Sequence, residues 1–243
     1  IAKKILNNLI PFVYRNADSV HCLTQRIAEN LIKNYNVPKR KITVIPNFVD
    51  VENVKRKSNE RILILKRKDY YKNPYIVSMG RLHNQKGFKY LIEAFSRLAY
   101  QVPHTLIILG KGPLENDLKM LVKSLNLENR IIFEGFIKNP YPILKKADLF
   151  VLSSLYEGMP NALLEAIALD VPIISSDCPS GPSEILGKSY KHLLYNPKDT
   201  DRLTKMIKKQ LRNPVIVSKK VLETNFSVSQ ILIKYGNLID HNS

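Results

Sequence analysis

The chain has 243 residues, of which 44% are hydrophobic and 24% are charged, and its formal net charge is +17. This length allows one or two domains with a buried core, and the composition excludes a short disulfide-stapled peptide and a disordered chain. Two cysteines, Cys22 and Cys178, are too few for a disulfide framework or a four-ligand zinc site, which favours a reducing compartment. No apolar run approaches the roughly 18 residues of a membrane span. The start at Ile1 without a signal-peptide pattern predicts a fragment of a longer protein.

The first 50 residues have a pattern of their own. It predicts two helices and two strands, with Thr24 as an N-cap: a helix through Val13, a strand from Ser19 to Leu23, a helix from Thr24 to Tyr35 and a strand from Ile42 to Ile45. Pro46 and Asn47 then break the chain. We interpret residues 1–49 as the tail of a first domain and residues 50–74, which have no clean period, as a basic connection between domains.

The positive charge is concentrated in this connection. Its cations are Lys55, Arg56, Lys57, Arg61, Lys66, Arg67, Lys68 and Lys72. Such a run can meet an anionic membrane, a nucleic acid or a phosphorylated substrate, and a solvated linker explains it equally well.

From residue 75 onward, short β-branched runs alternate with segments of helical period, which is typical of parallel βαβ units. The predicted strands are Tyr75 to Met79, Thr105 to Leu109, Arg130 to Phe133, Leu149 to Leu152, Pro172 to Ser175 and His192 to Tyr195. The predicted helices are Phe88 to Ala99, Leu114 to Leu125, a single turn at Ile143 to Lys146, and Asn161 to Leu169. The pattern therefore predicts an α/β fold with a Rossmann-like, doubly wound parallel sheet.

The chain is predicted to be helical after residue 198. Asn213 and Pro214 interrupt the pattern, and Ser227 is placed to cap a last helix. We assign residues 75–225 to the Rossmann-like domain and 226–243 to a carboxy-terminal helix.

Residues that follow the strands of an open parallel sheet are the candidates for ligand binding. After the first strand comes a loop from Gly80 to Gly87, in which Arg81 and Lys86 can hold an anion together with free helix amides. A second glycine loop follows the next strand, at residues 110–113. Each loop taken alone is more typical of a tight turn than of a phosphate site.

The most specific segment is residues 153–166, in which Glu157 precedes a predicted helix and Glu165 lies within it. The amino end of that helix offers amides to a diphosphate, and the two carboxylates can accept hydrogen bonds from a sugar and a ribose. Taken without the other loops, both glutamates are ordinary surface residues.

Together these segments resemble the carboxy-terminal donor domain of the retaining glycosyltransferases of family 4, which have the GT-B fold. The resemblance covers nearly the whole chain and rests on residues 16–19, 45–50 and 80–87, and on the spaced glutamates of residues 153–166. It implies transfer of a hexose or N-acetylhexosamine from a UDP-sugar to a lipid-linked or polysaccharide glycan, with a cytoplasmic location at the inner face of the membrane.

The resemblance also implies a role for each site residue. Arg81, Lys86 and Glu157 form the catalytic set, in which the two cations hold the donor diphosphate and the carboxylate meets a sugar hydroxyl. Glu165 would accept from the ribose. The remaining predicted contacts to the nucleobase, sugar and phosphate are Gly80, Phe136, Ile137, Gly158, Met159, Pro160, Asn161 and Ala162.

Two residues depart from the family pattern. Ser183 replaces an Arg found in relatives that use galactose or N-acetylated hexosamines, and Asp170 replaces a helix-ending Gly. We expect Asp170 to adopt the left-handed conformation at a cost in stability.

The acceptor-binding amino-terminal domain of the family is missing, apart from its tail. The expected partners are therefore a nucleotide-sugar, a glycolipid or glycan acceptor, an anionic membrane surface, and an acceptor domain removed from this chain or supplied by another. The alternative is a catalytically silent nucleotide-sugar-binding fragment or subunit.

Other functions have less support in the sequence. No carboxylate and histidine cluster has metal-ligand spacing, so we expect no metal and no cofactor besides the donor substrate. A nucleic-acid partner is not expected, because the basic run lacks interleaved aromatics apart from Tyr70 and Tyr71. We expect packing or capping roles for the histidines and a packing role for Cys178.

Overall fold

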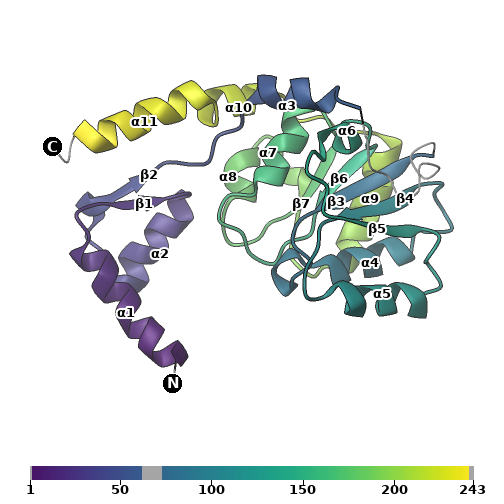
Figure 1. Ribbon diagram of the computed structural model, residues 1–243, viewed down its shortest axis with the longest axis horizontal. Coiled ribbons are helices and arrows are strands. Elements are labelled where there is room, and N and C mark those ends of the chain that lie inside the picture. The colour runs from purple at the N-terminus through teal and green to yellow at the C-terminus, as the bar shows by residue number, and fades with distance from the viewer. Residues whose placement is uncertain (1, 62–72, 241–243) are drawn as a thin grey trace.

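The computed structural model describes residues 2–61 and 73–240, which form two α/β units of unequal size (Figure 1). The smaller unit contains α1 (Ala2–Asn16), β1 (Val20–Cys22), α2 (Gln25–Tyr35) and β2 (Ile42–Val44). The two strands pair in parallel. The Thr24 hydroxyl accepts a hydrogen bond from the Ile27 amide at 3.2 Å, which confirms the predicted N-cap of α2.

The larger unit is built on six parallel strands in the order β5-β4-β3-β6-β7-β8. The strands are β3 (Tyr75–Met79), β4 (Thr105–Leu109), β5 (Ile131–Gly135), β6 (Leu149–Leu152), β7 (Ile173–Ser176) and β8 (Leu194–Tyr195). The helices between them are α4 (Phe88–Ser96), α5 (Glu115–Ser124), α6 (Tyr141–Leu144), α7 (Asn161–Ala168) and α8 (Pro182–Leu186). The predicted Rossmann-like sheet is confirmed, and α8 is a short helix that the sequence pattern did not indicate.

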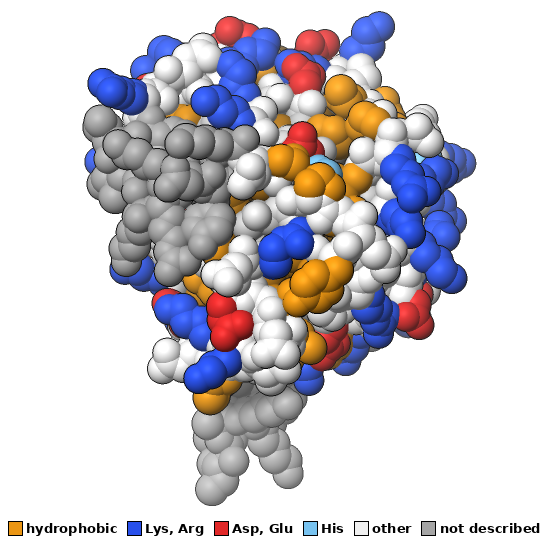
Figure 2. All heavy atoms as spheres, turned by 90° about the vertical axis from the view of Figure 1, so that its right-hand side faces the viewer, with side chains coloured by type: hydrophobic (Ala, Val, Ile, Leu, Met, Phe, Trp, Pro, Cys, Tyr) orange, Lys and Arg blue, Asp and Glu red, His pale blue; other side chains and the backbone are white. Residues whose placement is uncertain are grey.

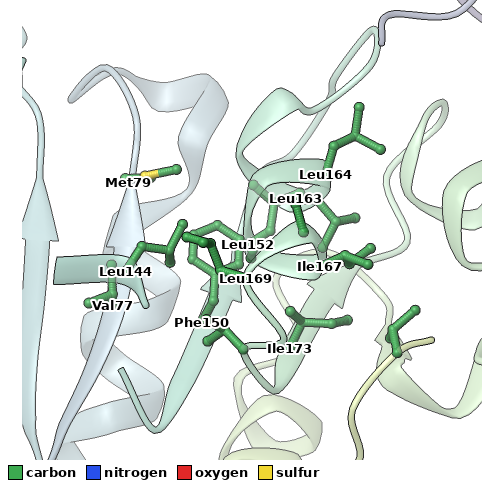
Figure 3. Close-up of a cluster of buried hydrophobic side chains, with 14 of the residues drawn as sticks. Val77, Met79, Leu144, Phe150, Leu152, Leu163, Leu164, Ile167, Leu169 and Ile173 are labelled. Carbon is green, nitrogen blue, oxygen red and sulfur yellow. The ribbon is translucent and has the colours of Figure 1, made fainter. Parts of the chain in front are cut away.

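Successive residues of each central strand enter different cores, because side chains alternate between the faces of a sheet. In β3, Val77 and Met79 pack with α6 and α7, whereas Ile76 packs on the opposite face with α4, α5 and α9 (Thr200–Arg212). Figure 3 shows the first of these cores, where Leu163 and Ile167 of α7 face the sheet. Apolar cores on both faces explain why the strands read as continuous hydrophobic runs.

Residues 51–58 differ from the prediction. They form α3 (Val51–Ser58), although this segment shows no clean helical period. The Asp50 carboxylate caps the helix by accepting from the Asn53 amide at 2.9 Å, and Val54 is buried against the larger unit. The cap and the packing of Val51, Val54 and Ser58 on one side of the helix therefore stabilise α3. Within the predicted connection, residues 62–72 lie outside the described residues.

The carboxy-terminal part is helical, as predicted. α9 is followed by α10 (Lys220–Asn225) and α11 (Val228–Asp240), and α9 ends at the predicted break, with Asn213 as its C-cap. α11 leaves the larger unit and reaches back over the smaller one (Figure 1), where the ring of Tyr235 lies 5.4 Å from that of His21. Among the described residues, no helix has both the length and the apolar character needed to cross a membrane.

The surface carries the excess positive charge of the chain. Figure 2 shows one side of the larger unit, where many Lys and Arg side chains surround patches of exposed hydrophobic residues. At the other end of the molecule, α1 exposes Leu9, Phe12 and Val13.

Candidate functional site

A cavity of about 840 Å³ lies beyond the carboxyl ends of the central strands. The chain runs from β3 outward to β5 and then returns to place β6 on the other side of β3, so β3 and β6 form the switch point of the sheet. Ligands of open α/β sheets bind at such a point. The lining residues are Met79, Gly80, Arg81, Lys86, Leu109, Gly110, Lys111, Phe136, Ile137, Pro140, Glu157, Met159, Pro160, Asn161, Ala162 and Glu165.

Lys86 and Glu157 form an ion pair at one wall of this cavity. Lys86 Nζ lies 2.6 Å from Glu157 Oε1, and the same oxygen accepts a hydrogen bond from Ser154 Oγ at 2.6 Å. The Lys86 side chain is 20% exposed and that of Glu157 is 7% exposed. The pair therefore stands at the border between the protein interior and the cavity.

The loops that carry these two residues are bound to each other. The Leu155 amide donates to the Gln85 carbonyl at 2.7 Å, and Ser153 Oγ donates to the Lys86 carbonyl at 2.8 Å. Gly87 has φ of 61°, and a Cβ there would lie 2.2 Å from the Ser153 carbonyl oxygen. Glycine is required because the backbone is left-handed and no room exists for a side chain.

The amino end of α7 faces the cavity with free amides. Pro160 is the N-cap and provides no side-chain hydrogen bond, and the amides of Asn161 and Ala162 have no protein acceptor among the described residues. The Asn161 side chain accepts from Asn47 Nδ2 at 2.8 Å, which links α7 to the segment that joins the two units. This end of the helix can therefore bind an anion through its amides.

Glu165 lies about one turn further along α7 and is partly buried. Burial raises the pKa of its carboxyl group, and a hydrogen bond from the Tyr141 hydroxyl at 3.1 Å partly offsets this effect. Burial, with the nearby carboxylate, raises the pKa of Tyr141 to about 12, so the phenol remains a donor at neutral pH.

The structure brings almost all of the predicted site residues to one cavity. Of the twelve residues predicted, Gly158 is the exception, because it does not line the cavity and instead approaches the smaller unit, where a Cβ would lie 3.3 Å from Leu23 Cδ1. Its predicted role in binding stays a prediction. Gly110 and Lys111 of the second glycine loop also line the cavity, and the lining residues that we did not predict are Met79, Leu109 and Pro140. Two of them could have been predicted from their position, since Met79 and Leu109 are the last residues of two strands.

The residues for which we expected structural roles lie outside the cavity lining. His83 Nδ1 accepts from the Gln85 amide at 3.4 Å and caps a short 3-10 turn, and His21 Nε2 lies 2.6 Å from the Ile45 carbonyl oxygen. Cys178 is fully buried, and burial raises the pKa of its thiol to about 11, which makes a thiolate nucleophile unfavourable.

The cavity combines positive charge with two separated carboxylates. Arg81 and Lys111 have no ion-pair partner within the part of the chain that the structure describes, and Lys86 adds a third cation. These cations and the amides of α7 suit a phosphorylated group, while Glu157 and Glu165 suit hydroxyl groups. No group of three His, Cys, Asp or Glu side chains able to hold a metal ion occurs in residues 2–61 and 73–240.

Comparisons with known proteins agree with this geometry. Residues 61–225 match the family model of glycosyl transferases group 1, and residues 1–53 match that of glycosyltransferase family 4. The chain is 31% identical over 205 residues to the N-acetylgalactosamine-N,N'-diacetylbacillosaminyl-diphospho-undecaprenol 4-alpha-N-acetylgalactosaminyltransferase of Campylobacter jejuni, covering 84% of this chain and 54% of that protein. It is 36% identical over 190 residues to the UDP-Gal:alpha-D-GlcNAc-diphosphoundecaprenol alpha-1,3-galactosyltransferase of Escherichia coli, covering 74% and 48%.

The fold is likewise shared with solved structures. The Anabaena protein HepE in complex with UDP and glucose superposes with a TM-score of 0.82 at 20% identity, covering 98% of this chain and 66% of that chain. The present chain spans about half the length of the two curated relatives above. The matched family model, the parallel sheet and the spaced glutamates agree, and the chain belongs to the group 1 glycosyl transferases with the GT-B fold.

Proposed function

We propose that this chain is the donor half of a retaining glycosyltransferase that uses a UDP-sugar. The observation that carries the proposal is the meeting of Arg81, Lys86, the free amides of α7 and two separated carboxylates around one cavity. A UDP-sugar has a matching order of groups, with a diphosphate between a ribose and a hexose. The names of the relatives from Campylobacter jejuni and Escherichia coli support a hexose or N-acetylhexosamine as the transferred group.

In this proposal each group of the donor meets the chemistry that it needs. Arg81, Lys86 and the amides of α7 bind the diphosphate and stabilise the negative charge that develops as it leaves. Glu165 accepts from the ribose, the segment at Phe136 and Ile137 faces the nucleobase, and Glu157 accepts from a sugar hydroxyl. A divalent metal is not needed for binding, because side chains and amides supply the counter-charge.

In this proposal, donor binding changes the ion pair of Lys86 and Glu157. Lys86 Nζ lies 2.6 Å from Glu157 Oε1, and a diphosphate in the cavity would compete for the same ammonium group. Glu157 would then be free to accept from the sugar. Diphosphate binding would in this way prepare the sugar subsite.

The acceptor side belongs to this proposal as well. The names of these two relatives support a lipid-linked or polysaccharide glycan as acceptor, and an acceptor domain would complete the cleft. The exposed Leu9, Phe12 and Val13 of α1 and the net charge of +17 support peripheral contact with an anionic membrane. The alternative is a nucleotide-sugar-binding subunit without activity of its own.

Calorimetry with UDP in the presence of EDTA tests the proposed donor site. We expect UDP to bind, and Glu165→Ala to weaken it by about 1 to 3 kcal/mol, the range of a charge-assisted hydrogen bond. Binding of GDP or ADP in place of UDP would contradict the proposed donor class.

Turnover is measured separately with a UDP-sugar and a glycolipid acceptor. We expect no enzyme-like rate from this chain alone, because one cleft wall cannot orient both substrates. Restored transfer on addition of an acceptor domain would favour the enzyme over the silent subunit.

A further inference from the structure

Tyr141 connects two walls of the cavity, although it is absent from the predicted site residues. It is the first residue of α6 and directly follows the loop that contributes Phe136, Ile137 and Pro140 to the cavity. Its hydroxyl donates to Oε1 of Glu165 at 3.1 Å. A single segment therefore contributes to the cavity lining and also holds the Glu165 carboxylate.

The backbone of Tyr141 is itself fixed. Its amide donates to Oδ1 of Asn139 at 3.3 Å, and Nδ2 of Asn139 donates to the Lys57 carbonyl of α3 at 3.0 Å. Pro142 in the first turn of α6 restricts the chain further. The phenol thus projects from a rigid base, which is what a residue needs in order to orient another side chain.

Glu165 depends on this one donor. It forms no ion pair among the described residues, and Oε2 has no hydrogen-bond partner there. An ionised carboxylate accepts through both oxygens, so Tyr141 occupies one of them and leaves the other to a ligand in the cavity. Without the phenol, the side chain of Glu165 would have more rotamer freedom to lose on binding.

We propose that Tyr141 is a positioning residue that orients the Glu165 carboxylate toward the ribose hydroxyls. This inference rests on the proposed contact between Glu165 and the ribose. Tyr141 acts through Glu165 and touches the ribose itself at no point. The site therefore distinguishes a ribonucleotide from one without ribose hydroxyls most strongly when both residues are present.

The test compares UDP with 2′,3′-dideoxyuridine 5′-diphosphate, which keeps the base and the diphosphate but lacks both hydroxyls. Calorimetry is carried out on the parent chain, Tyr141→Phe, Glu165→Ala and the double variant. We expect Tyr141→Phe to weaken UDP roughly three- to tenfold, as expected for the loss of one modest interaction, and to leave the dideoxy ligand within about twofold. In the Glu165→Ala background, Tyr141→Phe should cause no further loss of UDP affinity.

Tyr100→Phe is the matched control, because it removes a hydroxyl that contacts the Asn126 carbonyl on the protein surface. It should change neither affinity. Equal weakening of both ligands by Tyr141→Phe, or a further loss in the Glu165→Ala background, would overturn the positioning role while leaving the donor site intact. If the parent chain binds UDP and the dideoxy ligand equally, the proposed contact of Glu165 with the ribose is wrong. If it binds neither ligand, the proposed donor site is wrong.

Discussion

Replacing Lys86 by Met removes the ammonium group of the cavity ion pair and keeps most of the apolar stem. The Glu157 carboxylate, 7% exposed, is then left with the Ser154 hydroxyl as its side-chain partner. Breaking a buried ion pair costs about 3 to 5 kcal/mol, and an exposed pair contributes about 0 to 1 kcal/mol. Since Lys86 is 20% exposed, we expect Lys86→Met to lower the free energy of unfolding by about 2 to 4 kcal/mol.

Glu157→Gln removes the other charge of the same ion pair and should lower the free energy of unfolding by less than Lys86→Met does. The amide keeps the shape and can still bond to Ser154 and Lys86, and the ammonium group borders the cavity, where water can reach it. We expect Glu157→Gln to lower the free energy of unfolding by about 1 kcal/mol. The two variants also differ in ligand binding, because Lys86→Met removes a diphosphate contact whereas Glu157→Gln releases Lys86 and removes a nearby negative charge. UDP should therefore bind at least as tightly to Glu157→Gln as to the parent chain.

Urea unfolding at pH 7, with and without UDP, measures both effects. UDP at about 100 times its Kd should stabilise the parent chain by about 2.7 kcal/mol and Glu157→Gln by at least as much, and this gain should be small for Lys86→Met. Lys89→Met is the control, since its partner Glu93 lies 3.8 Å away on the surface, and it should change stability by less than about 0.5 kcal/mol. A larger loss of stability in Glu157→Gln than in Lys86→Met, or an undiminished effect of UDP on Lys86→Met, would refute the reasoning.

Three further predictions concern stability. Burial raises the pKa of the Glu165 carboxyl group, so its ionisation destabilises the fold once the pH exceeds the ordinary glutamate pKa of 4.5. Glu165→Gln should therefore be more stable than the parent chain at pH 7, and the difference should disappear at low pH. Urea unfolding at several pH values measures this difference. Gly87→Ala should lower the free energy of unfolding by more than about 2 kcal/mol and abolish UDP binding, because the new Cβ would collide with the backbone of Ser153. Gly236→Ala is the control, since a Cβ there has no atom within 4 Å and should not destabilise the chain. Asp170 has φ of 56° and contacts Lys219, so Asp170→Gly should raise the thermal midpoint through a gain of up to about 1 kcal/mol, and a lower midpoint would show that the contact outweighs the strain.

The sequence by itself determined the architecture of the larger unit and the region of the site. The strands at residues 75–79, 105–109 and 149–152 have the predicted bounds, because strands buried on both faces appear as short apolar runs between turn signals. The site region was predictable because, in a parallel sheet, the loops after successive strands meet at one edge. The left-handed conformation expected at Asp170 is also confirmed.

Only the tertiary structure decided how the side chains of the site are paired. Lys86 and Glu157 are 71 positions apart, and Tyr141 and Glu165 are 24 apart, so no local pattern indicates either contact. α3 was missed for a related reason, since its stability comes from one cap and from packing against the larger unit. Periodicity reports the faces that a segment buries, whereas a pairing depends on where the backbone of a distant element lies, and that position is fixed only when the whole sheet has assembled.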